Sequence, residues 1–176
     1  NQCYKFILMN WDNIFLKNYL KITFGVLLVV TASRLIPHPP NFTALIALSF
    51  YVPSILGKKY IPSLLLSFVV TDLIIGFHQT ILFTWGSVIL IGLFSSYFSF
   101  SLKRRISGAF LSACLFFLIT NFGVWLTGVY GLTINGLILC YTLAIPFFGY
   151  TLVSTLLYSG IIEIINSQYK KIKKII

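Results

Sequence analysis

Acidic residues are almost absent from this chain, which has 3 Asp and Glu against 13 Lys and Arg in 176 residues. Charged residues of both signs make up only 9% of the sequence, whereas about 25% is usual in a soluble globular domain. Hydrophobic residues make up 58%, and the mean hydropathy is +0.94. This composition excludes a soluble domain and predicts an all-α integral membrane protein.

Sequence signatures of enzymes are also absent. The sequence contains no paired carboxylates, no His-Glu-x-x-His, no Gly-x-Ser-x-Gly and no nucleotide-binding glycine loop. The three cysteines, Cys3, Cys114 and Cys140, are too far apart for a metal motif and are expected to be small apolar residues. We therefore expect no enzyme, no metal and no cofactor. An intramembrane enzyme would need two catalytic groups within hydrogen-bond reach in a wet cleft.

What the chain does have is basic residues in clusters, separated by apolar stretches each long enough for two membrane passes. Positive charges favour the cytoplasmic side, so the clusters predict a bundle of six transmembrane helices with both termini cytoplasmic. Helix-flanking positions also explain the net charge of +10 without a nucleic-acid partner. The clusters hold every basic residue except Arg34: Lys5, Lys17 and Lys21; Lys58 and Lys59; Lys103, Arg104 and Arg105; and Lys170, Lys171, Lys173 and Lys174.

One membrane domain is predicted at residues 20–166, after an interfacial lead-in at 1–19 and before a basic cytoplasmic tail at 167–176. Met9 is expected to be the start of the native chain. Residues 134–140 are predicted to form a re-entrant or surface helix, and Pro146 is predicted to break or kink the chain before the last span. The predicted spans cover residues 20–36, 42–56, 60–77, 80–100, 107–127 and 146–166.

Polar residues inside or between the spans fall almost entirely on the outer side of this topology. An ionisable side chain in a membrane usually faces the protein interior and has a partner. Because Arg34 and Asp72 lie at similar predicted depths, we expect them to form an ion pair. The pair either pins two spans together or contacts a ligand. The outer-side residues are Arg34, His38, Asn41, Asp72, His78, Gln79, Asn121, Tyr130, Asn135 and Tyr141.

Asn121 lies near several aromatic residues and is interpreted in two ways. It either bonds another helix or orients a planar ligand against Trp125, Tyr130 and Tyr141. Trp85 is expected in the aromatic belt at the membrane surface. His38 and His78 are expected in outer loops, without the spacing of a metal site. Glu163 is expected to face the Lys170 tail, as a helix cap or ion-pair partner.

Four segments carry a resemblance to a known family: Arg34 to Thr43, Asp72 to His78, Phe117 to Leu126, and Cys140 to Phe148. They resemble an uncharacterised family of bacterial inner-membrane proteins usually labelled as transport proteins. That family is similar to the substrate-binding S components of energy-coupling-factor (ECF) vitamin transporters. The resemblance implies an S-component-like bundle whose outer ligand pocket is covered by the loop between the first two spans.

The resemblance also implies a function, a location and partners. We expect a multi-pass subunit of the bacterial inner (plasma) membrane that binds a small vitamin-like or nucleobase-like solute for uptake, with a transmembrane coupling subunit and ATPases as partners. The first span lacks the Ala-x-x-x-Ala motif through which S components contact the coupling subunit. The alternative is a structural or assembly protein whose polar residues hold helices together. The expected substrate-binding residues are Arg34, His38, Asn41, Asp72, His78, Asn121, Trp125 and Tyr141.

Overall fold

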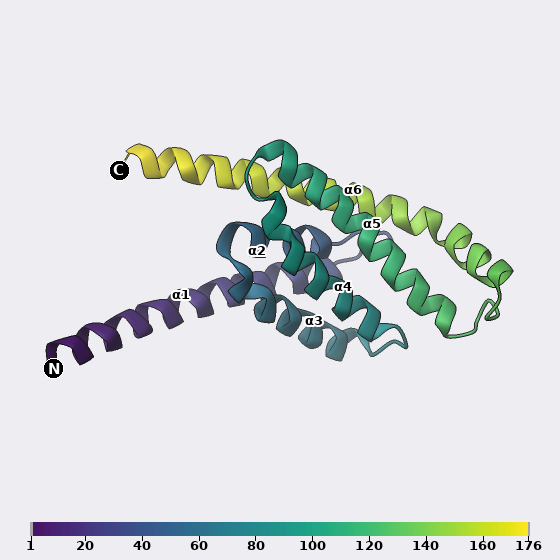
Figure 1. Cartoon of the computed structure of the whole chain (residues 1–176), viewed down its shortest axis with the longest axis horizontal. Helices are drawn as coiled ribbons and strands as arrows, with labels where there is room; N and C mark the ends of the chain where they lie inside the picture. Colours follow the sequence, from purple (N-terminus) through teal and green to yellow (C-terminus); the bar gives the residue numbers. More distant parts are fainter. Residues whose placement is uncertain (1, 176) are drawn as a thin grey trace.

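The computed structural model describes the backbone of residues 2–175 and the side chains of residues 16–171. Over this part of the chain the structure is all-helical, with no strand (Figure 1). The elements in chain order are α1 (Gln2–Leu35), α2 (Leu45–Leu56), the 3-10 turn η1 (Lys58–Tyr60), α3 (Ile61–Ile75), α4 (Ile81–Phe94), the 3-10 turn η2 (Ser95–Phe98), α5 (Leu102–Leu126) and α6 (Ile134–Ile175).

Four segments of the described chain are long and apolar enough to cross a membrane. They are Leu16–Leu35, Ile81–Phe98, Leu102–Leu126 and Ile134–Lys171. The 12 residues of α2 and the 15 residues of α3 extend only about 18 and 22 Å at 1.5 Å per residue, which is less than the roughly 30 Å of a hydrocarbon core. The structure therefore shows an all-helical membrane protein with four full-length candidate spans and two shorter helices.

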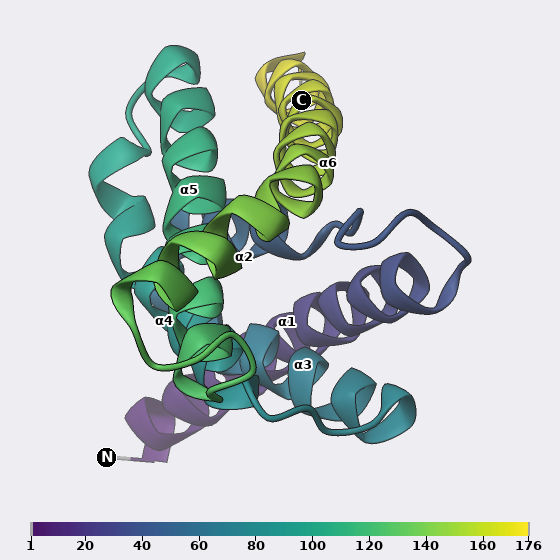
Figure 2. The same ribbon diagram turned by 90° about the vertical axis from the view of Figure 1, so that its right-hand side faces the viewer.

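The helix α2 lies at the centre of the bundle, in contact with helices on all sides. It packs against α4, α5 and α6, and more lightly against α3 and α1. Two pairs of helices pack around it, with α1 against α3 and α5 against α6 (Figure 2). A short helix in this position can bury nearly all of its side chains, and α2 is buried almost continuously from Leu45 to Pro53.

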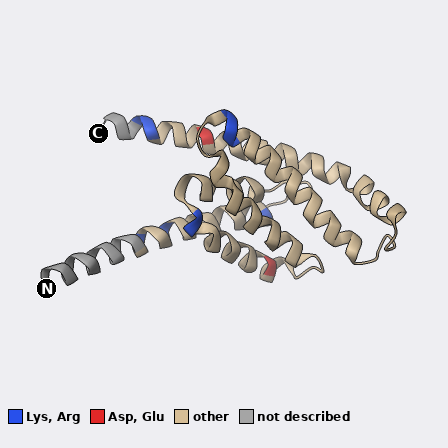
Figure 3. Ribbon diagram, viewed as in Figure 1, with Lys and Arg blue, Asp and Glu red and all other residues tan. Residues whose placement is uncertain are grey.

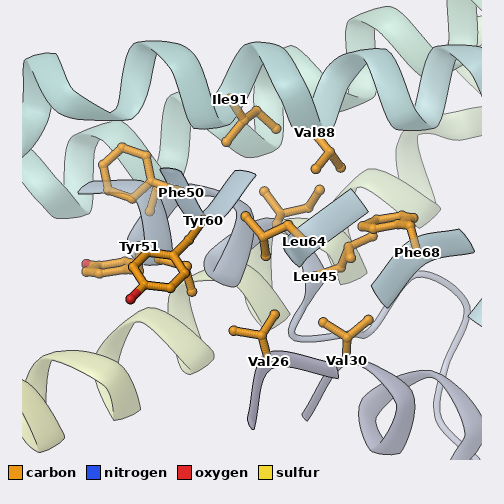
Figure 4. Packing of buried hydrophobic residues seen from close by; sticks show 13 residues of the cluster. Val26, Val30, Leu45, Phe50, Tyr51, Tyr60, Leu64, Phe68, Val88 and Ile91 are labelled. Atoms are coloured by element: carbon orange, nitrogen blue, oxygen red, sulfur yellow. The ribbon is translucent and has the colours of Figure 1, made fainter. Parts of the chain in front are cut away.

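The hydrophobic core is built where α1, α3 and α4 meet the central helix (Figure 4). Leu64 and Phe68 of α3 and Val88 and Ile91 of α4 are fully buried there. Many large apolar side chains elsewhere, such as Leu82, are exposed. A soluble monomer rarely exposes so much apolar surface, so the outer face of the bundle suits contact with lipid.

The last helix differs from the prediction. The prediction of a separate helix at residues 134–140 was wrong, because α6 is continuous from Ile134 to Ile175 and contains Pro146. Proline removes one backbone donor and clashes with the preceding turn, which bends a helix without always ending it. The green and yellow parts of α6 point in different directions (Figure 2), which fits the predicted kink. Residues 167–175, predicted as a tail, continue the helix.

Charge is distributed unequally along the long axis of the bundle (Figure 3). Lys and Arg gather in the half of the molecule that contains both termini, whereas the half with the loops at 76–80 and 127–133 is almost free of charge. This arrangement is the one that the positive-inside rule favours when the termini face the cytoplasm.

Candidate functional site

The last turn of α1 and the last turn of α3 meet through an ion pair. The Nη2 of Arg34 lies 2.6 Å from Oδ1 of Asp72, and the two side chains are only 14% and 1% exposed. A second guanidinium nitrogen of Arg34, Nη1, donates to the hydroxyl of Thr71. The predicted pairing of Arg34 with Asp72 is therefore confirmed, and it joins α1 to α3.

The second oxygen of Asp72 is held by α4. The indole Nε1 of Trp85 donates to Oδ2 of Asp72 at 2.8 Å, and the ring of Trp85 packs against the hydrophobic core. The polar atom of Trp85 thus points to a buried carboxylate, a role that the sequence did not predict. Asp72 thus links three helices, since it belongs to α3, forms an ion pair with α1 and accepts a hydrogen bond from α4.

A cavity of about 430 Å³ lies beside this network, between the loop 36–44, the loop 76–80 and the helices α5 and α6. Five of the eight predicted binding residues line it. These are Arg34, His38, Asn41, His78 and Asn121. Asp72 is fully buried and does not line the cavity, so it acts on the cavity through Arg34.

The polar residues around the cavity are fixed by local hydrogen bonds that leave part of each group unused. The Nδ1 of His38 donates to the carbonyl of Pro39 at 2.7 Å, so Nε2 of the neutral ring is an acceptor. The Nδ2 of Asn121 donates to the carbonyl of Phe117 at 2.8 Å, which uses one of its two amide N–H groups. The Nδ1 of His78 lies 3.0 Å from the hydroxyl of Thr80.

The loop that covers the cavity is shaped at Asn41. This residue has a positive φ of 63°, a conformation that Asn tolerates better than most residues. Its carbonyl accepts from the hydroxyl of Ser154 on α6 at 3.5 Å. The loop is therefore tied to the far side of the cavity by a weak contact.

The aromatic wall of the cavity was not predicted from the sequence. With 17 phenylalanines in the chain, no pattern distinguishes those that face a cavity from those that face lipid. Threonines that line the cavity, from loops and from helix interiors, were also missed. The wall and the missed hydroxyl groups are Phe68, Phe116, Phe117, Phe147, Phe148, Thr43, Thr80, Thr84, Thr120 and Thr151.

The structure does not bring Trp125 and Tyr141 to this cavity. The Nε1 of Trp125 donates to the carbonyls of Gly131 and Thr133 at 3.1 and 3.3 Å, and the hydroxyl of Tyr141 donates to the carbonyl of Leu118 at 2.6 Å. Both residues therefore hold α5, α6 and their connecting loop together. Their positions do not support the predicted stacking on a ligand in the Arg34 cavity.

Replacing Trp125 with phenylalanine is expected to loosen this loop at a cost of about 1 kcal/mol, because one shared hydrogen bond is lost at a partly exposed site. The matched change Trp85→Phe should cost more, about 1–3 kcal/mol, because it leaves a buried carboxylate oxygen without its donor. Thermal unfolding in detergent compares the two variants. Equal costs would contradict the assignment of Trp85 to the buried network.

A second charged pair lies at the opposite end of the bundle. Nε and Nη2 of Arg105 bond the two oxygens of Glu163 at 2.6 and 2.8 Å, and Nη1 of Arg105 donates to the carbonyl of Ser99 at 3.0 Å. The ion-pair partner of Glu163 is thus Arg105 on α5, and Lys170 lines the same surface pocket as Glu163. This bidentate pair joins α5 to α6 and is far along the bundle from the Arg34 cavity.

A metal is not suggested by the described side chains, among which no group of three or more His, Cys, Asp or Glu is close enough to hold an ion. The fold and the cavity define an all-helical membrane protein with a small, aromatic-walled site anchored by a few polar groups.

The chain belongs to the family of unknown function designated DUF6580, whose model matches residues 16–172. No curated protein matches the chain. No solved structure matches it either.

Proposed function

We propose that this protein is a membrane subunit that binds a small planar solute in the Arg34 cavity for uptake into the cell. The observation that carries the proposal is the cavity itself. Small-molecule sites are concave and mostly apolar, with a few placed polar groups that orient the ligand. Arg34, Asn121 and the two histidines supply such groups, and the phenylalanines supply flat walls.

The proposed topology places the cavity on the outer side of a bacterial inner membrane. In this arrangement the shorter helices α2 and α3 also cross the membrane, surrounded by the rest of the bundle. This gives six passes, cytoplasmic termini and an architecture like that of ECF S components. A coupling subunit and ATPases would then supply the energy for uptake. The support for this orientation is the segregation of Lys and Arg to the half with the termini (Figure 3).

Reporter fusions test this topology. A fluorescent protein that matures only in the cytoplasm is expected to be bright when fused after residue 175 or inserted after Lys59. An alkaline phosphatase that is active only outside the cytoplasm is expected to be active when fused at Gly131. Reversal of these signals would place the cavity on the inner side and overturn the proposed direction of uptake.

Solute binding is tested by thermal unfolding of the purified protein with a panel of vitamins, vitamin precursors and nucleobases. A bound solute raises the unfolding temperature because it stabilises only the folded state. Thr120→Trp, which fills the cavity, should abolish the response. Thr142→Trp is the matched control, because both hydroxyls bond the carbonyl four residues earlier at 2.8 Å but Thr142 lies outside the cavity.

A structural or assembly role is the second candidate. It is favoured by the contacts of Asp72, both of whose oxygens meet protein groups from neighbouring helices. Under this alternative the network holds helices together and the cavity has no ligand. If no solute of the panel stabilises the native protein or the Thr142→Trp control, the result supports the structural role against solute binding.

A further inference from the structure

The lining of the cavity has one charged residue, and it is a cation. Among the residues that line it, Arg34 carries a permanent positive charge, and none is Asp or Glu. The nearby carboxylate of Asp72 is 1% exposed. A cationic solute would therefore find no anionic partner in the cavity, and burying an unpaired charge is costly.

The guanidinium group of Arg34 is only partly occupied by protein. It has five N–H donors, and its contacts are one oxygen of Asp72 and the hydroxyl of Thr71. Asp72 meets Arg34 through Oδ1 alone, and its Oδ2 accepts from Trp85 instead. Some N–H donors of the guanidinium are therefore not used by the protein, and Arg34 lines the cavity.

The orientation of Arg34 is fixed by its surroundings. Its guanidinium carbon lies 5.3 Å from the centre of the Phe68 ring, and the buried carboxylate of Asp72 holds one nitrogen. A planar group that is stacked and hydrogen-bonded on one side loses little further freedom when it binds a ligand with the other. Asp72 and Phe68 are in this sense positioning residues.

The start of α2 lies at the cavity and has free backbone donors. Leu45 and Ile46, the first residues of this helix, line the cavity and are buried. No side chain caps the helix, and in the described chain the backbone N–H groups of Leu45, Ile46 and Ala47 have no hydrogen-bond acceptor. A buried helix start without acceptors favours an anion, because its N–H groups and its dipole both attract negative charge.

Building on the proposed solute-binding function, we propose that the solute carries a carboxylate, bound between Arg34 and the start of α2. Its planar body lies against the phenylalanines of the wall. A carboxylate suits this site better than a phosphate, because the only permanent positive charge is already partly balanced by Asp72. A phosphate ester would bring up to two negative charges to one shared guanidinium.

Matched compounds that differ only in charge test this assignment. Each set has one planar ring with a carboxylate, a carboxamide, an aminomethyl group or a phosphate ester, on pyridine, benzene, indole and purine rings. Calorimetric titration of the purified full chain is expected to show carboxylates binding at least about tenfold more tightly than their carboxamides, since charge-assisted hydrogen bonds are the stronger ones. The amines are expected not to bind.

Variants of Arg34 and Asp72 give opposite results. Arg34→Gln should weaken carboxylate binding at least about tenfold, whereas Arg104→Gln, which removes an exposed cation elsewhere, should leave it unchanged. Asp72→Asn should tighten carboxylate binding severalfold, because the guanidinium no longer shares its charge with a buried carboxylate. A purely structural role for the pair would instead weaken binding in both variants.

A variant at the start of α2 keeps the test valid if Arg34→Gln does not fold. Thr43→Asp places a carboxylate of the protein in the cavity lining, one residue before the N-cap Ala44, where the dipole of the helix favours negative charge. It should therefore keep the fold and exclude the solute carboxylate. Thr133→Asp, which places the same charge at the start of α6, outside the cavity, should keep binding.

The outcomes separate this assignment from the proposed function. Solutes that bind regardless of charge, or carboxylates whose affinity survives both Arg34→Gln and Thr43→Asp, would overturn the carboxylate assignment and leave solute binding intact. Preferred binding of the phosphate esters would also overturn it. If no compound of any charge binds, the proposed function fails and the carboxylate assignment fails with it.

Discussion

Replacing Asp72 with alanine is expected to lower the free energy of unfolding by about 3–5 kcal/mol, because it leaves a buried guanidinium without its counter-charge. The side chain of Arg34 is only 14% exposed, so solvent offers little compensation. The indole of Trp85 loses its acceptor in the same variant. Reversible unfolding in detergent or bicelles, followed by intrinsic fluorescence or circular dichroism, measures the loss.

Asp72→Asn is the informative control for this variant. Asparagine keeps an oxygen that can accept from Trp85 but removes the charge that pairs with Arg34. We therefore expect a smaller loss of stability than for Asp72→Ala. If Asp72→Ala costs less than about 1 kcal/mol, as an exposed ion pair would, the network does not hold α1, α3 and α4 together.

Replacing Gly108 with alanine is expected to lower the free energy of unfolding by about 3 kcal/mol, because overpacking a filled core forces neighbours out of place. A Cβ atom at this position would lie 2.5 Å from the ring of Phe50 and 2.8 Å from Cβ of Phe98. Phe50 is fully buried in the central helix, so its ring has no free space to move into. This glycine therefore allows α5 to approach α2.

Gly160 provides the matched control within α6. A Cβ atom there would meet nothing within 4 Å, so Gly160→Ala should leave stability unchanged or raise it by about 0.5 kcal/mol, through helix propensity and a less flexible unfolded chain. The two substitutions are chemically identical and are expected to have opposite signs. A loss of similar size in both would mean that the packing of α5 on α2 does not decide the result.

The residues that the sequence predicted best are the rare ones. The pairing of Arg34 with Asp72 could be predicted from the sequence, because a lone charge in a membrane is costly and each residue had only one counterpart at its predicted depth. The gathering of the basic clusters at one end of the bundle (Figure 3) was likewise predictable, since it depends on position along the chain. Both arguments use where a residue lies along the membrane normal.

The rotation of each helix about its axis was not predictable in this way. Helices whose faces are all apolar give no periodic signal of the inner face, so the depth of Trp125 and Tyr141 did not reveal that they lie outside the cavity. The same ambiguity placed Trp85 in the interfacial belt, because an indole with one polar atom suits both an interface and a buried acceptor. Pro146 was ambiguous because neighbouring helices can accommodate a proline.

Determining the structure of the protein saturated with the most tightly binding carboxylate of the matched sets tests the central claim most directly. The expected result is density for the solute inside the cavity, with its carboxylate within hydrogen-bond distance of Arg34 and of the first N–H groups of α2, and its ring against the phenylalanine wall. Density for the solute at another place, or a cavity closed by side chains while the solute is bound elsewhere, would contradict it.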